Sequence, residues 1–288
     1  MTVMKFPHRP LVMGIVNVTP DSFSGDGLAR GTDVIAAAVD QAARMLGEGA
    51  DILDIGGESS RPGATPVSAE EETRRVVPVI EAIRARFGHG SPVAVDTVKA
   101  VVAEAALKAG ADIVNDISAL THDQAMAGVV ARHGCFVVLM HNRAVVGNVS
   151  HDARIGGEYG GADYGDIVAD VKRGLMQTVE AARKVGIADD KIILDPGLGF
   201  GKTVEQNLAL VRHTGDIKSL GFPLLIGPSR KSFIGKVLDL PVDDRLEGTA
   251  ATVAISAFLG ADIIRVHDVK FMARVARMAG GIQNGKSE

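Results

Sequence analysis

Residues 92–116 read PVAVDTVKAVVAEAALKAGADIVND, which is a short apolar run, an alanine-rich stretch and a second apolar run. The runs at 92–95 and 112–114 are nearly continuous in apolar residues, as is typical of strands that are buried on both faces. The stretch between them has the length of a helix, and Gly110 is placed to end it. A strand, a helix and a second strand in this order predict parallel strand pairing.

The same pattern repeats along the whole chain. Apolar strand-like runs lie at 11–18, 51–55, 92–95, 112–114, 135–140, 191–194, 223–226 and 262–266. Helices are predicted between and after them, at 32–48, 68–87, 98–109, 122–133, 164–185, 204–214, 246–259 and 268–279. Repetition of this unit over 288 residues predicts a single (β/α)₈ barrel domain of the α/β class, spanning residues 1–288.

A doubly wound open sheet is the alternative fold, and it would carry a glycine-rich fingerprint after its first strand. Here the first strand runs into NVTPD at 17–21, so the barrel is favoured. No linker or low-complexity segment divides the chain. We expect a long mobile loop at 147–165 and a frayed tail at 283–288.

Composition argues against several classes of protein. Lys and Arg number 31 against 35 Asp and Glu, so the formal net charge of −4 disfavours general binding to nucleic acid or to a membrane surface. The single cysteine excludes an internal disulfide framework and fits a reducing compartment. No apolar stretch reaches the ~18 to 20 residues of a membrane span, and residues 1–10 lack the apolar core of a signal peptide. We therefore expect a cytoplasmic globular protein.

Polar residues follow almost every predicted strand. In a barrel these positions face one pocket, so a ligand site is predicted there. Asp96, Asn115 and Asp195 end three different strands and are expected to form its floor. Two carboxylates and an amide can hydrogen-bond along the edge of a flat, nitrogen-rich heterocycle. The alternative is that Asp96 and Asp195 cap the helices that follow them.

Positively charged residues are expected at the mouth of the same pocket, namely Arg61, Lys231, Arg265 and His267. Arg265 and His267 alternate along the last strand, so their side chains point to the same side. Together with Arg61 they suit a phosphate or diphosphate group. Asn17 could reach that anion through a bound magnesium ion, which prefers oxygen ligands. The alternative for His267 is a structural histidine.

Three other features of the sequence bear on catalysis. The segment GLGFGKT at 197–203 is similar to a nucleotide-triphosphate loop, but the required first glycine falls on Pro196, so the match fails. Cys135 begins an apolar strand and is predicted to be a core residue. His141 follows a strand without a nearby nucleophile, and its role stays open.

Seven segments in order along the chain resemble the dihydropteroate synthases, folate-pathway enzymes that are the targets of sulfonamides. They are MGIVNVTPDSFS at 13–24, DIGGESSRPGA at 54–64, VDT at 95–97, VNDI at 114–117, DPG with GFGK at 195–202, SRKSF at 229–233 and RVHDV at 265–269. The resemblance implies a (β/α)₈ barrel and a homodimer, for which apolar faces at 249–259 and 271–278 are available. It also implies an enzyme that uses Mg²⁺ and joins 6-hydroxymethyl-7,8-dihydropterin diphosphate to 4-aminobenzoate, giving 7,8-dihydropteroate and diphosphate.

The resemblance also implies roles for single residues. Contacts to the pterin are implied for Asp96, Asn115, Met140, Asp195 and Lys231, and Gly227 is implied to bind substrate. The diphosphate and magnesium site is implied for Asn17, Arg265 and His267. The aminobenzoate site is implied for Ser60, Arg61, Pro62, Phe200, Ser229 and Lys231. The implied mechanism is dissociative: diphosphate leaves first, and Asp96 stabilises the resulting cation. Catalytic roles are also implied for Arg61, Lys231, Arg265 and His267.

Two departures from the family pattern bear on activity. The segment at 59–62 reads SSRP where the family usually has STRP, and an aspartate of the first loop is displaced to Asp26. Two other hypotheses about the function therefore stay open. A non-catalytic pterin-binding paralogue is favoured only by the displaced Asp26. A folate and corrinoid methyltransferase of the same superfamily is disfavoured by Arg61, Arg265 and His267.

Overall fold

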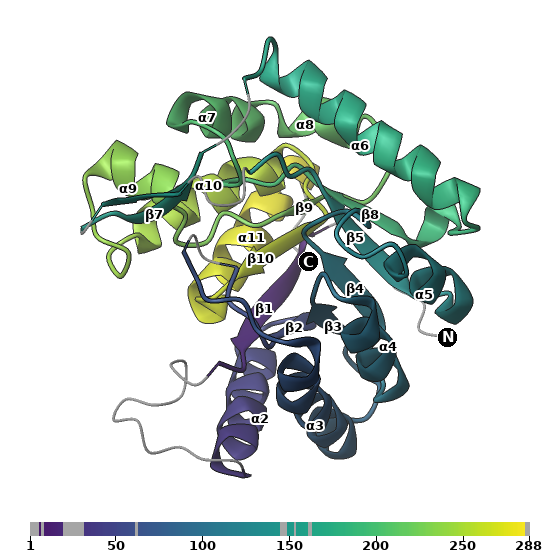
Figure 1. Ribbon diagram of the computed structural model, residues 1–288. Helices are drawn as coiled ribbons and strands as arrows, with labels where there is room; N and C mark the ends of the chain where they lie inside the picture. Colours follow the sequence, from purple (N-terminus) through teal and green to yellow (C-terminus); the bar gives the residue numbers. More distant parts are fainter. Residues whose placement is uncertain are drawn as a thin grey trace.

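Eight parallel strands form the centre of the structure (Figure 1). The computed structural model describes residues 6, 9–19, 32–60, 63–144, 149–152, 154–160 and 163–285. The strands are β1 (Leu11–Asn17), β2 (Ile52–Gly56), β3 (Val93–Asp96), β4 (Ile113–Asp116), β5 (Phe136–Met140), β8 (Ile192–Asp195), β9 (Leu225–Ile226) and β10 (Ile263–Val266).

The strands close into a barrel. They pair in the order β8-β5-β4-β3-β2-β1-β10-β9, and a parallel bridge between Leu194 and Leu224 joins the two ends of the sheet. The backbone amide of Leu194 donates to the Pro223 carbonyl at 2.9 Å across this seam. The predicted (β/α)₈ barrel is therefore confirmed, and the open-sheet alternative is wrong.

Helices surround the barrel (Figure 1). They are α2 (Thr32–Gly47), α3 (Ala69–Phe87), α4 (Ala100–Lys108), α5 (Met126–His133), α6 (Ile167–Lys184), α7 (Val204–Arg212), α10 (Leu246–Phe258) and α11 (Val269–Asn284). Side-chain caps begin several of them: Ser68 caps α3, Asp166 caps α6, and Thr203 forms a capping box with Gln206 at α7. The short helices α8 (Thr214–Lys218) and α9 (Ser232–Leu238) and the 3₁₀ turn η1 (Asp189–Lys191) were not predicted.

The inside of the barrel is apolar at its base. Its side chains come from alternate strand positions: Leu11, Met13, Ile52, Ala94, Ile113, Phe136, Val138, Ile193, Leu225 and Ile263. Because strand side chains alternate between faces, the next inward positions toward the carboxyl ends are Asp54, Asp96, Asn115, Asp195 and Arg265. The remaining strand residues pack outward against the helices. This alternation places a layer of polar side chains between the apolar base of the barrel and the open carboxyl ends of its strands.

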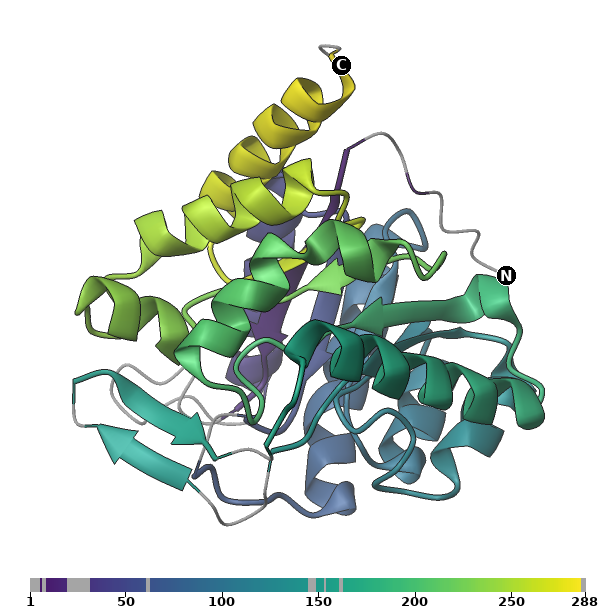
Figure 2. The same cartoon turned by 90° about the horizontal axis from the view of Figure 1, so that it is seen from above.

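The segment predicted as a long mobile loop at 147–165 contains an antiparallel hairpin instead. Its strands are β6 (Val149–Asp152) and β7 (Gly156–Tyr159). The hairpin lies beside α9 (Figure 2). A glycine-rich, polar segment lacks the alternation that marks a strand, so the pairing was not visible in the sequence.

The last helix runs further than predicted. It ends at Asn284, two residues into the segment expected to be a tail, and 286–288 lie outside the described residues. Among the residues that the structure describes, no helix is long and apolar enough to cross a membrane.

Candidate active site

A cavity of about 360 Å³ opens at the carboxyl ends of the strands, where a barrel of this kind holds its ligands. Nine of the residues predicted for the site lie on its wall: Asn17, Ser60, Asp96, Phe200, Gly227, Ser229, Lys231, Arg265 and His267. Asn115, Met140 and Asp195 are buried at neighbouring strand ends and are not among its lining residues. Arg61 and Pro62, and Asp26 of the first loop, lie outside the described residues.

Arg265 is the centre of the polar floor. Its Nε donates to Asp54 Oδ2 at 2.6 Å, and its Nη2 donates to Asp96 Oδ2 at 2.6 Å. Asn115 Nδ2 donates to the same Asp54 oxygen at 3.0 Å. The prediction placed Arg265 at the mouth, whereas the structure joins it to the floor carboxylates.

Asp54 was missed by the sequence analysis. It is fully buried, and its second oxygen, Oδ1, has no hydrogen-bond partner among the described residues. A buried carboxylate oxygen without a partner is costly, so this atom is suited to accept a hydrogen bond from a ligand. The available signal was a single charge inside the otherwise apolar strand ILDIG at 52–56.

The two carboxylates that share Arg265 are electrostatically coupled. Burial raises the pKa of Asp96 to about 7; the charge of Arg265 opposes this rise and the charge of Asp54 adds to it. Burial alone would lower the pKa of Arg265, but the charges of Asp54 and Asp96 outweigh it and raise that pKa. Arg265 therefore stays charged, while Asp96 is poised to change protonation near neutral pH.

Asp96 and Asp195 do not cap the helices that follow them, so that alternative is wrong. The N-cap of α4 is Lys99 and that of α7 is Thr203. Asp195 Oδ1 instead accepts a hydrogen bond from the Gly197 amide at 2.7 Å. Burial raises the pKa of Asp195 despite that bond and the nearby charge of Lys231.

Lys231 lies against the aromatic side of the cavity. Its Nζ is 4.1 Å from the centroid of the Phe200 ring, which is the distance of a cation–π contact. Burial, together with the charge of Arg265, lowers the pKa of Lys231 to about 8. The ring of Tyr159 stacks on Phe200 with 5.8 Å between centroids and an interplanar angle of 18°.

The segment after β8 is held by a buried lysine. Lys202 Nζ donates to the backbone carbonyls of His141, Gly197 and Phe200 at 3.2, 2.9 and 3.0 Å. A lysine engaged in this way is not available to a nucleotide phosphate, which agrees with the failed motif match. Its contacts set the position of Phe200 instead.

His141 contributes to this segment through its backbone. Its amide donates to the Asp195 carbonyl at 2.8 Å, and its carbonyl accepts from Lys202. Burial and the charges of Lys202 and Arg143 lower the pKa of the His141 ring to about 3, so the imidazole is neutral. Cys135 is buried and burial raises the pKa of its thiol to about 12, which confirms it as a core residue.

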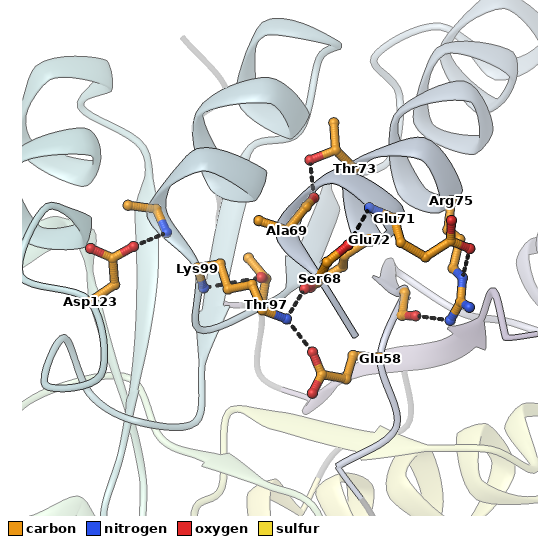
Figure 3. A network of polar contacts seen from close by, with 12 residues as sticks. Glu58, Ser68, Ala69, Glu71, Glu72, Thr73, Arg75, Thr97, Lys99 and Asp123 are labelled. Atoms are coloured by element: carbon orange, nitrogen blue, oxygen red, sulfur yellow. Dashed lines mark hydrogen bonds and ion pairs between the residues drawn. The ribbon is translucent and has the colours of Figure 1, made fainter. Parts of the chain in front are cut away.

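A network of charges holds the segment after β2, which carries Ser60 (Figure 3). Lys99 forms ion pairs with Glu58 and with the buried Glu72, whose Oε2 is 2.5 Å from Lys99 Nζ. Arg75 Nη1 donates to the Gly57 carbonyl at 2.8 Å. These contacts join the wall of the cavity to helices α3 and α4.

His267 and Asn17 lie at the rim predicted to hold an anion. His267 Nδ1 and Ser229 Oγ are 3.0 Å apart, and the His267 amide donates to the same hydroxyl at 3.2 Å. Asn17 ends β1 and lies on the wall of the cavity, so its amide oxygen is near the anion rim. The described residues contain no cluster of three His, Cys, Asp or Glu side chains that could cage a metal. A magnesium ion would therefore fit here only with most of its ligands from substrate oxygens and water.

Comparisons with known proteins agree with this geometry. The chain matches the family model described as pterin binding enzyme over residues 13–267. It is 46% identical to the dihydropteroate synthase of Bacillus subtilis over 290 residues, which cover 99% of this chain and 94% of that protein. The structure of dihydropteroate synthase from Clostridium difficile, determined in the presence of pteroic acid, has a TM-score of 0.87 and 42% identity, over 97% of this chain and 99% of that one. The structure of the Xanthomonas albilineans dihydropteroate synthase with 4-aminobenzoic acid has a TM-score of 0.84 and 42% identity, over 96% of this chain and 93% of that one.

Proposed function

Because the chain belongs to the dihydropteroate synthases, transferases within the pterin-binding enzyme family, we propose that its cavity joins 6-hydroxymethyl-7,8-dihydropterin diphosphate to 4-aminobenzoate. The products are 7,8-dihydropteroate and diphosphate, and the reaction belongs to folate biosynthesis. The observation that carries the proposal is the polar floor around Arg265, which lies in one cavity with an aromatic wall and a His267–Ser229 rim.

The floor binds the pterin. Asp96, Asn115 and Asp195 hydrogen-bond to the ring edge. Asp54 Oδ1, which has no hydrogen-bond partner among the residues that the structure describes, accepts from a ring donor. Burial makes each of these hydrogen bonds stronger than it would be in water. Other pterin contacts come from Met140, Gly227 and Lys231.

The rim binds the diphosphate. Arg61, Arg265 and His267 supply donors and positive charge to the leaving oxygen, and Asn17 is the residue that would hold a magnesium ion there. A bound magnesium ion would neutralise part of the diphosphate charge. The carbon–oxygen bond breaks with its electron pair on diphosphate, and the ionised Asp96 stabilises the cation at the pterin methylene.

The aromatic wall positions 4-aminobenzoate. Phe200 packs on its ring, and Ser60, Ser229 and Lys231 contact its carboxylate. The family resemblance assigns Arg61 and Pro62, which lie outside the described residues, to the same subsite. The neutral amine nitrogen attacks the methylene carbon and then loses a proton to water or to the released diphosphate. No covalent bond to the protein is needed.

The test is diphosphate release from the purified protein with the pterin diphosphate and magnesium, with and without 4-aminobenzoate. We expect release together with stoichiometric dihydropteroate only when 4-aminobenzoate is present in excess. Pterin binding without either product would overturn the proposal in favour of a non-catalytic paralogue. The matched control is Asp195→Ala, which should lose pterin binding.

We also propose that the protein is a homodimer through α10 and α11. An apolar groove of about 580 Å³ runs between these helices, lined by Ala254, Ile255, Phe258, Leu259, Arg274, Val275, Met278, Ala279 and Ile282. Phe258 and Met278 are 49% and 65% exposed, which is unusual for large apolar side chains that share one face. A second copy would cover them.

A further inference from the structure

Hairpin β6–β7 places one aromatic side chain on the wall of the cavity. The Tyr159 hydroxyl donates to the Ser60 carbonyl at 3.1 Å, and its ring stacks on Phe200. Ser60 belongs to the segment after β2 and Phe200 to the segment after β8. Tyr159 therefore connects three chain segments at one side of the cavity.

The position of the hairpin is set by contacts that do not involve Tyr159. Arg245 is 1% exposed, and its Nη2 donates to the Ile155 carbonyl at 2.7 Å. Its Nη1 donates to the Arg230 carbonyl at 3.0 Å, and Lys236 of α9 forms an ion pair with Glu158. These contacts anchor the turn and the second strand of the hairpin to the segments around α9, which places the Tyr159 ring against Phe200.

We propose that Tyr159 is a further positioning residue that determines specificity for the aromatic amine. The inference rests on the proposed function, in which Phe200 packs on 4-aminobenzoate. Stacked aromatic rings favour a flat partner, and the pair of Tyr159 and Phe200 extends the aromatic wall. The bond to Ser60 joins this aromatic wall to the segment after β2, which fixes the Tyr159 ring against Phe200.

The test is steady-state kinetics of Tyr159→Ala and Tyr159→Phe. We expect Tyr159→Ala to raise KM for 4-aminobenzoate roughly threefold to tenfold, the loss expected for one aromatic pair, with KM for the pterin diphosphate nearly unchanged. Tyr159→Phe keeps the ring and loses the bond to Ser60, so its KM for 4-aminobenzoate should lie between that of the wild type and that of Tyr159→Ala.

Tyr164→Phe is the matched control, because the chain has only 2 tyrosines. The buried Tyr164 hydroxyl has no hydrogen-bond partner among the described residues, so both KM values should stay at wild-type values. Thermal melting checks that each variant is folded, and Tyr159→Leu replaces Tyr159→Ala if the alanine variant melts early. A folded variant without the Tyr159 ring whose KM for 4-aminobenzoate is unchanged, or whose two KM values rise equally, overturns the inference. A wild-type protein that forms no dihydropteroate overturns the proposed function instead.

Discussion

Asp54 and Asp96 share a single guanidinium group, that of Arg265. Burial and the charge of Asp54 raise the pKa of Asp96 to about 7, against the opposing charge of Arg265, so raising the pH through that value favours its ionised form. The ionised form stabilises the cation in the proposed mechanism. We therefore expect kcat/KM for the pterin diphosphate to rise with pH through about 7, because kcat/KM reports ionisations of the free enzyme.

Asp54→Asn tests the origin of that pKa. Removing a negative neighbour favours the ionised form of Asp96. The rise of kcat/KM for the pterin diphosphate, which forms the acid limb of its pH profile, should therefore move to lower pH. Asp189→Asn, a change at an exposed carboxylate paired with Arg183, is the control and should leave the limb in place. An unmoved limb in Asp54→Asn would show that another group causes the ionisation.

Gly197 is a residue at which the backbone itself requires glycine. Its φ is +69°, and an added Cβ would lie 2.1 Å from the His141 carbonyl oxygen. We expect Gly197→Ala to lower the free energy of unfolding by more than about 1 kcal/mol, measured by denaturant titration. Gly165→Ala is the control, since nothing lies within 4 Å of its added Cβ. Equal stability of the two variants would contradict this account.

At the scale of single elements, helix α4 supports the segment after β2 through Lys99. Lys99→Met would leave the buried Glu72 without its cation, at a cost of about 3 to 5 kcal/mol in the free energy of unfolding. The segment that carries Ser60 should also loosen, so KM for 4-aminobenzoate should rise. Denaturant titration and steady-state kinetics measure the two effects.

Lys108→Met on the same helix is the control. Its ion pair with Glu104 is exposed, and exposed pairs contribute roughly 0 to 1 kcal/mol. The double variant Lys99→Met with Glu72→Gln removes the unpaired charge and should regain part of the lost stability. If it is no more stable than Lys99→Met alone, an unpaired Glu72 is not the cause.

At the scale of the whole molecule, the apolar face of α10 and α11 is where we expect the second copy. Met278→Glu would place a charge in that interface, and burying an unpaired charge is costly. Sedimentation velocity should therefore show a dimer for the wild type and a shift toward monomer for Met278→Glu. Val101→Glu, at a position 66% exposed on α4, should remain dimeric. A monomeric wild type would rule out this assembly.

The barrel and part of the site follow from local pattern. Strands that are buried on both faces and separated by amphipathic helices have few packing solutions, so repetition of the unit at 92–116 along the whole chain predicted the closed sheet. Asp96, Asn115 and Asp195 could be predicted because they end strands, and parallel strands bring their carboxyl ends together. The helix predicted at 68–87 was also correct, since it begins at Ala69 with Ser68 as its N-cap and ends at Phe87.

Contacts between distant parts of the chain could not be predicted in the same way. Arg265 reaches Asp54 across 211 positions and Tyr159 reaches Ser60 across 99, and neither pair has a local periodic signal. The first contact exists because β10 and β2 both pair with β1, and the second because a hairpin without strand-like alternation packs beside α9. Local periodicity determines which face of an element is buried. Which polar groups then meet depends on closure of the barrel and on packing of its loops, so these contacts come from the tertiary structure.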